Sequence, residues 1–352
     1  MSLFRHILFA AFCVLGVAVF PACRLVDEDV SDCNDNYSLN YELQLVTNLR
    51  TEIQTVLDLE ADIQVATALQ SYLSEIFTDF AHDVDLSFYD TAGLMDRLEH
   101  IGVVMDASQS SYTLFLPGRA YTHLCVANLE AEPFVGLEGG DRCGTARLVQ
   151  RPEVKDTISA HTTGIFTARM HMDVVSGTDQ RFDVGLYMAN SATALILDLA
   201  DAPDVKDIKV FLSGFADGFN IADSTYTFNT KQVVRTQLLP PALGSTERCY
   251  ASVHFPSRDV EEPSTKMVID IEDPDQDKRS DEILWQWEVY VTLSDGSVTK
   301  TILGSYNPLH PAKLKAVKGI VHADGGITPK DHTVGASITL DWHEGMVIPI
   351  DF

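Results

Sequence analysis

The chain is short of positive charge. It has 25 Lys and Arg residues against 51 Asp and Glu residues among 352, which gives a formal net charge of −26 at pH 7. Such a surface repels the phosphate backbone, so nucleic-acid binding is disfavoured. An acidic surface also keeps proteins soluble, so the charge alone identifies no partner.

Signatures of catalysis and metal binding are also missing. We find no Cys-x-x-Cys pair, no Gly-x-Ser-x-Gly elbow, no Walker loop and no Gly-x-Gly-x-x-Gly. Asp273, Asp275 and Asp277 imitate the first ligands of an EF-hand, but Lys278 replaces its glycine and Leu284 its bidentate glutamate. We therefore expect no enzyme activity, no cofactor and no metal, although distant residues can assemble a site that one sequence does not reveal.

The amino-terminal apolar segment is too short to cross a membrane. Arg5 and His6 precede an uncharged run of 14 residues from Ile7 to Phe20, whereas a membrane-spanning helix needs about 20. A basic head followed by a short apolar segment is typical of an export signal. We predict a signal peptide over residues 1–22.

Cys23 follows this segment in Phe-Pro-Ala-Cys, which resembles a bacterial lipobox. The motif predicts cleavage before Cys23 and acylation of its thiol by a chain such as palmitate. The Phe and Pro depart from the usual Leu and small residue, so ordinary secretion with Cys23 as a plain thiol is the alternative.

Three acids, Asp27, Glu28 and Asp29, lie close to the predicted lipid. The cluster resembles the signal that carries Bacteroidetes lipoproteins to the outer face of the outer membrane. The alternative is a solvated tether, over residues 23–36, that an anionic membrane repels. Both interpretations place the mature chain outside the cytoplasm.

Three ordered blocks of sequence carry a family resemblance. They are Cys23 to Cys33, Val84 to Gly93 with its Phe-Tyr-Asp-Thr-Ala-Gly turn, and Leu116 to Asn128 with Pro-Gly leading into an apolar strand. Together they resemble the start of the fimbrium anchoring subunits, the fimbrillin-associated anchor lipoproteins of Bacteroidetes type V pili. Asn34 departs from that pattern, because a proline often follows the second cysteine.

The resemblance implies a subunit that anchors a fimbrium, or pilus, at the cell outer membrane and regulates its length. Its partner would be the basal fimbrillin, bound by strand addition, with the lipid in the outer membrane and the protein facing the exterior. The alternative is a surface lipoprotein that binds glycans for capture or uptake. Trp285 and Trp287 share one face of a predicted strand, and two such rings more often belong to a core than to a sugar platform.

The hydrophobic pattern predicts an all-β fold with one inserted helix. Apolar residues alternate from Leu39 to Leu45, whereas Val56 to Phe80 has mostly three- and four-residue spacing, typical of a helix laid on a sheet. From Val84 onward we expect short strands separated by turns, with a poorly patterned connection from Glu130 to Ala160.

This pattern fits two Greek-key β-sandwiches in series, and the resemblance implies the transthyretin-like type. We place them at residues 37–178 and 179–352, with the division in a hairpin around Ser176 to Asp179.

Two further sites are predicted. Cys33 and Cys143 are the cysteines that we would test first for a disulfide, although four cysteines beyond Cys23 allow three pairings. At the carboxyl terminus Met346, Ile348, Ile350 and Phe352 alternate, as in the last strand of the domain's own sheet or in a strand that pairs with a fimbrillin.

Overall fold

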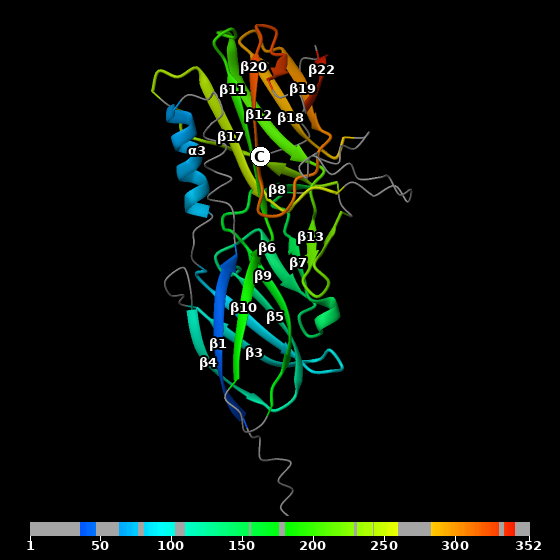
Figure 1. The fold of residues 1–352 in the computed structure, drawn as a ribbon. Coiled ribbons are helices and arrows are strands. Elements are labelled where there is room, and N and C mark those ends of the chain that lie inside the picture. Colours follow the sequence, from blue (N-terminus) through cyan, green and yellow to red (C-terminus); the bar gives the residue numbers. More distant parts are fainter. Residues whose placement is uncertain are drawn as a thin grey trace, which may run out of the picture.

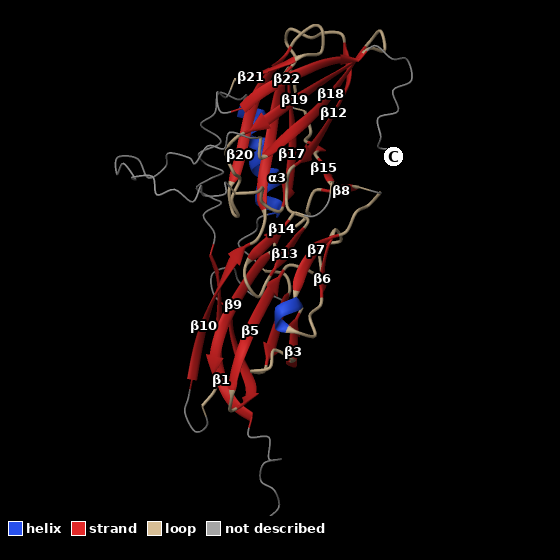
Figure 2. Ribbon diagram, turned by 90° about the vertical axis from the view of Figure 1, so that its right-hand side faces the viewer, coloured by secondary structure: helices blue, strands red, loops and turns tan. Residues whose placement is uncertain are grey.

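The computed structural model describes residues 36–46, 63–76, 81–102, 110–154, 156–175, 180–228, 231–241, 243–259, 283–330 and 334–341. Most of these residues lie in strands, and they include a single α-helix. The architecture is all-β with one inserted helix and two β-sandwiches, as the hydrophobic pattern predicted (Figures 1 and 2).

The first sandwich is a seven-stranded sheet folded onto itself. Its strands are β1 (Asn36–Val46), β2 (Val84–Tyr89), β3 (Met95–Ile101), β4 (Ser110–Pro117), β5 (Ala120–Ala127), β9 (Phe166–Asp173) and β10 (Gln180–Met188). They follow the order β3-β2-β5-β9-β10-β1-β4. β9 and β10 pair only at Thr167 with Tyr187 and Phe166 with Met188. Because they separate beyond these pairs, the sheet forms two layers, β3-β2-β5-β9 and β10-β1-β4.

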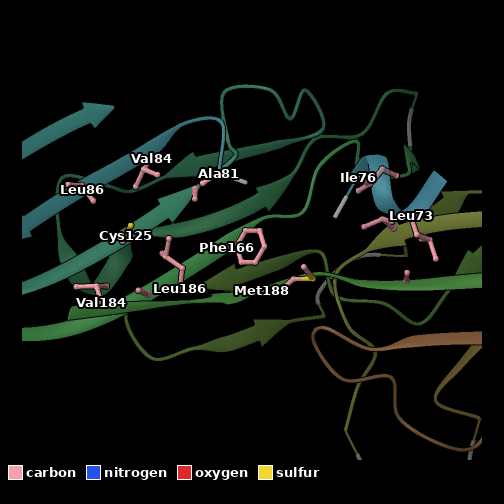
Figure 3. Close-up of a cluster of buried hydrophobic side chains, with 14 of the residues drawn as sticks. Leu73, Ile76, Ala81, Val84, Leu86, Cys125, Phe166, Val184, Leu186 and Met188 are labelled. Atoms are coloured by element: carbon pink, nitrogen blue, oxygen red, sulfur yellow. The ribbon is translucent and has the colours of Figure 1, made fainter. Parts of the chain in front are cut away.

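Alternating side chains fill the space between these layers. Leu86 of β2, Cys125 of β5 and Phe166 of β9 face Val184 and Leu186 of β10 (Figure 3). All five are buried. Cys125 is thus a small buried hydrophobic residue, as its apolar neighbours predicted.

The second sandwich packs a five-stranded sheet against a six-stranded sheet. The first has the order β16-β17-β11-β20-β21 and the second the order β22-β19-β18-β12-β15-β8. The five strands are β11 (Ser191–Asp198), β16 (Gln237–Leu238), β17 (Glu247–His254), β20 (Leu314–Val321) and β21 (Ile327–Pro329). The six are β8 (Thr157–Ser159), β12 (Val205–Ser213), β15 (Val233–Arg235), β18 (Trp285–Leu293), β19 (Val298–Ser305) and β22 (Val334–Asp341). Trp285, Trp287, Leu195 and Val317 lie in the core between them.

A tight turn at Asp295 and Gly296 joins β18 to β19. The Leu293 N–H donates to the Ser297 carbonyl oxygen over 2.9 Å, and Gly296 has a φ of 88°. Residues with a side chain rarely adopt this backbone conformation, so glycine suits this position of the turn.

The helix α3 (Ile63–Ile76) covers the outer face of the five-stranded sheet, beside β17 (Figure 1). Leu69 and Leu73 lie one turn apart on its buried face and pack with Ala194 of β11 and Ala251 of β17. The N–H of Gly164 caps the carboxyl end by donating to the Ile76 carbonyl oxygen over 2.9 Å. The predicted helix is confirmed, and the sheet that it covers belongs to the second sandwich.

A small four-stranded sheet joins the two halves. It has the order β14-β13-β7-β6 and consists of β6 (Val135–Glu138), β7 (Arg147–Gln150), β13 (Gly218–Asn220) and β14 (Thr225–Thr227). Leu148 and Phe219 pack there with Leu124 and Val126, on the outer face of β5. The expectation of an irregular connection from Glu130 to Ala160 was therefore wrong, because its short strands take partners from distant parts of the chain.

The chain passes into the second sandwich after β10. This strand follows the predicted division at residue 179, yet it pairs in the seven-stranded sheet. Ala189 and Asn190 then lead directly into β11. In the other direction, β8 lies before residue 179 and pairs in parallel with β15 of the second sandwich. Each sandwich thus contains strands from both sides of residue 179.

Candidate partner-binding edges

Most of the predicted site residues lie outside the described residues. These are Cys23, Asp27, Glu28, Asp29, Cys33, Met346, Ile348, Ile350 and Phe352. Lipidation, surface export, the disulfide and the partner strand therefore stay predictions. The described residues nevertheless show where the segments that follow or precede these residues enter the fold.

Cys143 is the one predicted site residue that the structure describes. It begins a short 3-10 helix, η2 (Cys143–Thr145), and its N–H donates to the Gly93 carbonyl oxygen over 2.9 Å. Partial burial raises the pKa of its thiol, and among the described residues it has no disulfide partner. A bond to Cys33 would tie the tether to this end of the four-stranded sheet.

The strand that follows the predicted tether, β1, lies in the middle of a layer. On one side its residues Leu39 to Val46 pair in parallel with Gln180 to Tyr187 of β10. On the other side Asn36 to Leu43 pair in antiparallel fashion with Pro117 to Ser110 of β4. The chain therefore enters the fold through a strand that is hydrogen-bonded along both edges.

A buried polar contact fastens β1 to the opposite layer. The Tyr41 hydroxyl lies 2.5 Å from His123 Nε2, and His123 Nδ1 lies 3.0 Å from the Ser87 carbonyl oxygen. A carbonyl oxygen only accepts, so Nδ1 carries the proton and the Tyr41 hydroxyl donates to Nε2. Burial lowers the pKa of His123 to about 4, which keeps the ring neutral in this role near pH 7.

Among the described residues, the edge strands β3 and β4 have one neighbouring strand each. Side chains connect these two edges. Arg97 of β3 donates from Nη1 to the Phe115 carbonyl oxygen of β4 over 2.6 Å. Arg119 pairs with Asp96 and donates from Nε to the Tyr121 hydroxyl over 3.0 Å. A strand added to β4 would therefore have to displace Arg97.

The second candidate edge is β22, at the border of the six-stranded sheet. Its residues Val334 to Asp341 pair with Ser305 to Val298 of β19 along their full length. In the part of the chain that the structure describes, β22 has no strand on its other side. Such a row of backbone groups is a template for another strand. The predicted partner strand, residues 346–352, follows it in sequence.

The two tryptophans weighed as a sugar platform lie in the core. Trp285 is 2% exposed and Trp287 is fully buried, and their ring centroids are 4.5 Å apart. The Trp285 indole donates to the Asn307 carbonyl oxygen over 2.9 Å. They do share one face, as predicted, and the interpretation of that face as core is confirmed.

Within the described ranges, no group of three His, Cys, Asp or Glu side chains is placed to hold a metal ion. The helix described here is neither long nor apolar enough to cross a membrane.

Sequence reasoning missed the buried polar residues that connect the parts of the fold. At the junction of the sandwiches, Asn190 donates from Nδ2 to His161 Nδ1 over 3.1 Å. Burial lowers the pKa of His161 to about 3 and that of His254 to about 4. Only His254 lies between two large apolar residues in the sequence, Val253 and Phe255. That is a signal for a buried polar residue, but it does not identify the partner.

No protein-family model matches the chain, and the search of curated proteins found none that is similar. The fold is similar to several solved structures at low identity. The fimbrial anchor protein Mfa2 from Porphyromonas gingivalis is 10% identical, with 86% of this chain and 99% of that chain covered and a TM-score of 0.48.

The tip fimbrial protein Mfa3 from the same organism, truncated at its carboxyl terminus, is 12% identical, with coverages of 87% and 100% and a TM-score of 0.40. A candidate adhesin from Bacteroides ovatus is 9% identical, with coverages of 88% and 96% and a TM-score of 0.49. These likenesses are of fold.

Proposed function

We propose that this chain is a lipid-anchored subunit of the outer membrane that holds a fimbrium at the cell surface by binding the basal fimbrillin. The observation that carries the proposal is the order of its amino terminus. A basic head, a short apolar segment, Cys23 and three acids precede β1, which is hydrogen-bonded along both edges within the first sandwich. A tether that continues into a strand paired on both sides is suited to holding the folded protein at the membrane.

The contact with the fimbrillin is proposed to be strand addition at an edge of the second sandwich. Main-chain hydrogen bonds along an edge give affinity, and alternate side chains give specificity. Of the edges compared above, β4 is linked to β3 through Arg97, whereas β22 has a strand on one side only among the described residues. We therefore assign the fimbrillin contact to β22 together with the segment 346–352.

The glycan-binding alternative requires aromatic rings that face the solvent. The pair that suggested it, Trp285 and Trp287, is buried between the two sheets. Tyr121 is also buried, at 1% exposure. These three rings therefore offer no solvent-facing surface for a sugar.

Replacing Cys23 by Ser should release the protein from the membrane or leave an unprocessed precursor. The acylated cysteine is the proposed anchor, and two acyl chains or more are needed for stable attachment. Membrane fractionation and mass spectrometry of the mature amino terminus measure the outcome. The matched control is Cys33→Ser, which keeps the anchor cysteine and should stay in the membrane fraction. An unmodified Cys23 on membrane-bound protein would disprove the proposal.

Deleting residues 346–352 should abolish retention of fimbriae on the cells while the melting temperature stays unchanged. The segment would act on the partner and not on the domain's own core. Fimbriae on cells and in the medium are counted, and unfolding of the purified protein is followed by circular dichroism. A large fall in melting temperature would make the segment this domain's own last strand, and normal fimbriae would also reject the assignment.

A further inference from the structure

The strands β1 and β10 pair in parallel. A pull between the amino terminus and the second sandwich would draw these two strands in opposite directions. Eight residue pairs, from Leu39 with Gln180 to Val46 with Tyr187, form this ladder. β1 receives the chain at Asn36, whereas β10 passes the chain on at Met188, at the opposite end of the ladder. Only two residues separate Met188 from Ser191, where β11 of the second sandwich begins.

Parallel pairing decides how such a ladder responds to tension. A pull between the amino terminus and the second sandwich draws β1 by its amino end and β10 by its carboxyl end. In a parallel pair these are opposite ends, so the strands slide and all the hydrogen bonds share the load. In an antiparallel pair the same two ends lie side by side, and the bonds would open one after another.

The direction of the pull agrees with the arrangement of the molecule. The first sandwich lies below the second in both ribbon views (Figures 1 and 2). The dark blue start of β1 is at its lower end (Figure 1). β1 rises from there toward the second sandwich (Figure 1). Tension between the tether and the second sandwich therefore acts along the strand.

Contacts on the other side of β1 and beneath it oppose the same sliding. Eight more pairs join β1 to β4, from Asn36 with Pro117 to Leu43 with Ser110. Leu39 and Tyr41 are fully buried, and the Tyr41 hydroxyl is bonded to His123 in the opposite layer. Sliding β1 by one residue would expose these side chains, because alternate residues face opposite sides.

The link from β10 to β11 is also fixed in place. Asn190 is fully buried and accepts the Ile165 N–H at Oδ1 over 2.8 Å. Its Nδ2 contacts His161 Nδ1 and donates to the Thr163 carbonyl oxygen over 3.0 Å. The Asn190 carbonyl oxygen accepts the Ala312 N–H over 2.8 Å. Tension transmitted along β10 thus reaches Asn190, which is hydrogen-bonded to residues of both sandwiches.

We propose that the parallel β1–β10 pair is a shear clamp that carries tension between the amino-terminal tether and the second sandwich. The inference rests on the proposed function for the presence of tension, and on the strand geometry for the response to it. The clamp would keep the first sandwich folded while a fimbrium pulls on the second.

Single-molecule force spectroscopy on the mature chain, expressed without the lipid, tests the clamp. One handle is the amino terminus. The other is a ligation tag inserted after Asp295, in the β18–β19 turn, which is the end of β18 away from the junction residues Phe215 and His254. The comparison geometry places the tag after Gly118, beside the end of β4 that pairs with Asn36.

We expect the unfolding force to be several-fold higher with the tag after Asp295 than with the tag after Gly118. The first geometry slides β1 along its partners, whereas the second opens its ladder with β4 from one end. Tyr41→Phe should lower the force in the first geometry, because it removes the bond to His123. Tyr290→Phe removes a hydroxyl from the second sandwich and should leave that force unchanged.

Equal forces in the two geometries would overturn the clamp. So would unfolding of the second sandwich before β1 is released, or an unchanged force in Tyr41→Phe. None of these outcomes depends on lipidation or on a fimbrillin, so failure of the clamp and failure of the anchoring proposal can be told apart. A protein that is not attached to the membrane, but that still unfolds at the higher force in the first geometry, would contradict only the anchoring proposal.

Discussion

Three buried histidines are expected to withdraw up to about 4 kcal/mol of unfolding free energy together for each pH unit below 6.5. His123 is fully buried in the first sandwich, and His161 and His254 are buried at the junction. Burial lowers the pKa of these rings to about 4, about 3 and about 4, respectively. The folded chain therefore keeps all three neutral until the solution is strongly acidic.

The unfolding free energy falls on acidification because the unfolded chain binds more protons than the folded chain. In the unfolded chain each imidazole takes up a proton near pH 6.5, whereas in the folded chain it does so near pH 3 or 4. Between these values the unfolded state holds more protons, so each ring withdraws about 1.4 kcal/mol of stability per pH unit. The stability is fully present above pH 6.5 and is lost as the pH falls toward 4.

Other groups oppose this trend. The hydrogen bond to Asp85 raises the pKa of the exposed His100, and burial raises the pKa of Glu132. Both take up protons more readily in the folded chain, which favours folding on acidification. Acid also relieves the self-repulsion of a chain with net charge −26. The slope that belongs to each buried ring is therefore best measured as a difference between variants.

Denaturant unfolding of the wild type and of His123→Gln, His161→Gln and His254→Gln, between about pH 5 and 6.5, measures these differences. Each substitution should reduce the slope of unfolding free energy against pH by about 1 kcal/mol per unit over this range, whatever its effect on stability itself. Gln70→Ala replaces an exposed side chain that does not titrate and should leave the slope unchanged. Wild-type slopes in all three buried variants would contradict the prediction.

Local pattern was enough to predict the elements whose side chains face one core. The alternation around Leu39 and Tyr41 predicted β1, and the spacing of Leu69, Leu73 and Ile76 predicted α3. Both patterns reflect burial on one side, and burial has the period of the backbone conformation. The Asp-Gly turn at Gly296 was predictable for a similar reason, since it needs one residue with positive φ.

Partners distant in the sequence could not be predicted in this way. Nothing in the alternation of β1 says that it pairs in parallel with β10, about 140 residues later. The short strands β6, β7 and β8 are stable because residues from the other half complete their sheets. Too few residues show a period there, so the segment was interpreted as a connection.

The candidate site residues also differ in how far the sequence predicts them. Cys23 and the acids beside it could be interpreted because a processing signal is read as a short linear motif. The edge of β4 is different, since its partial closure depends on Arg97 of β3 reaching the Phe115 carbonyl oxygen. A contact between two edges of one folded sheet has no signature in either strand alone.

Leu73→Ala should lower the free energy of unfolding by about 2 to 5 kcal/mol, and it should weaken both sandwiches together. Leu73 is fully buried and packs α3 onto Ala194 and Ala251 of the second sandwich. The same helix precedes β2 of the first sandwich in the chain. Because the four-stranded sheet and the β8–β15 pair also cross between the halves, neither half should unfold alone.

Hydrogen exchange at the backbone amides of β2 and β17, with denaturant unfolding, measures this coupling. In Leu73→Ala, protection should fall by a similar factor in the two strands, and the unfolding transition should remain single. Gln70→Ala changes an exposed position of the same helix and should alter stability by no more than about 0.5 kcal/mol. Loss of protection confined to β17 would mean that the sandwiches unfold independently. The four-stranded sheet and the β8–β15 pair would then not couple them.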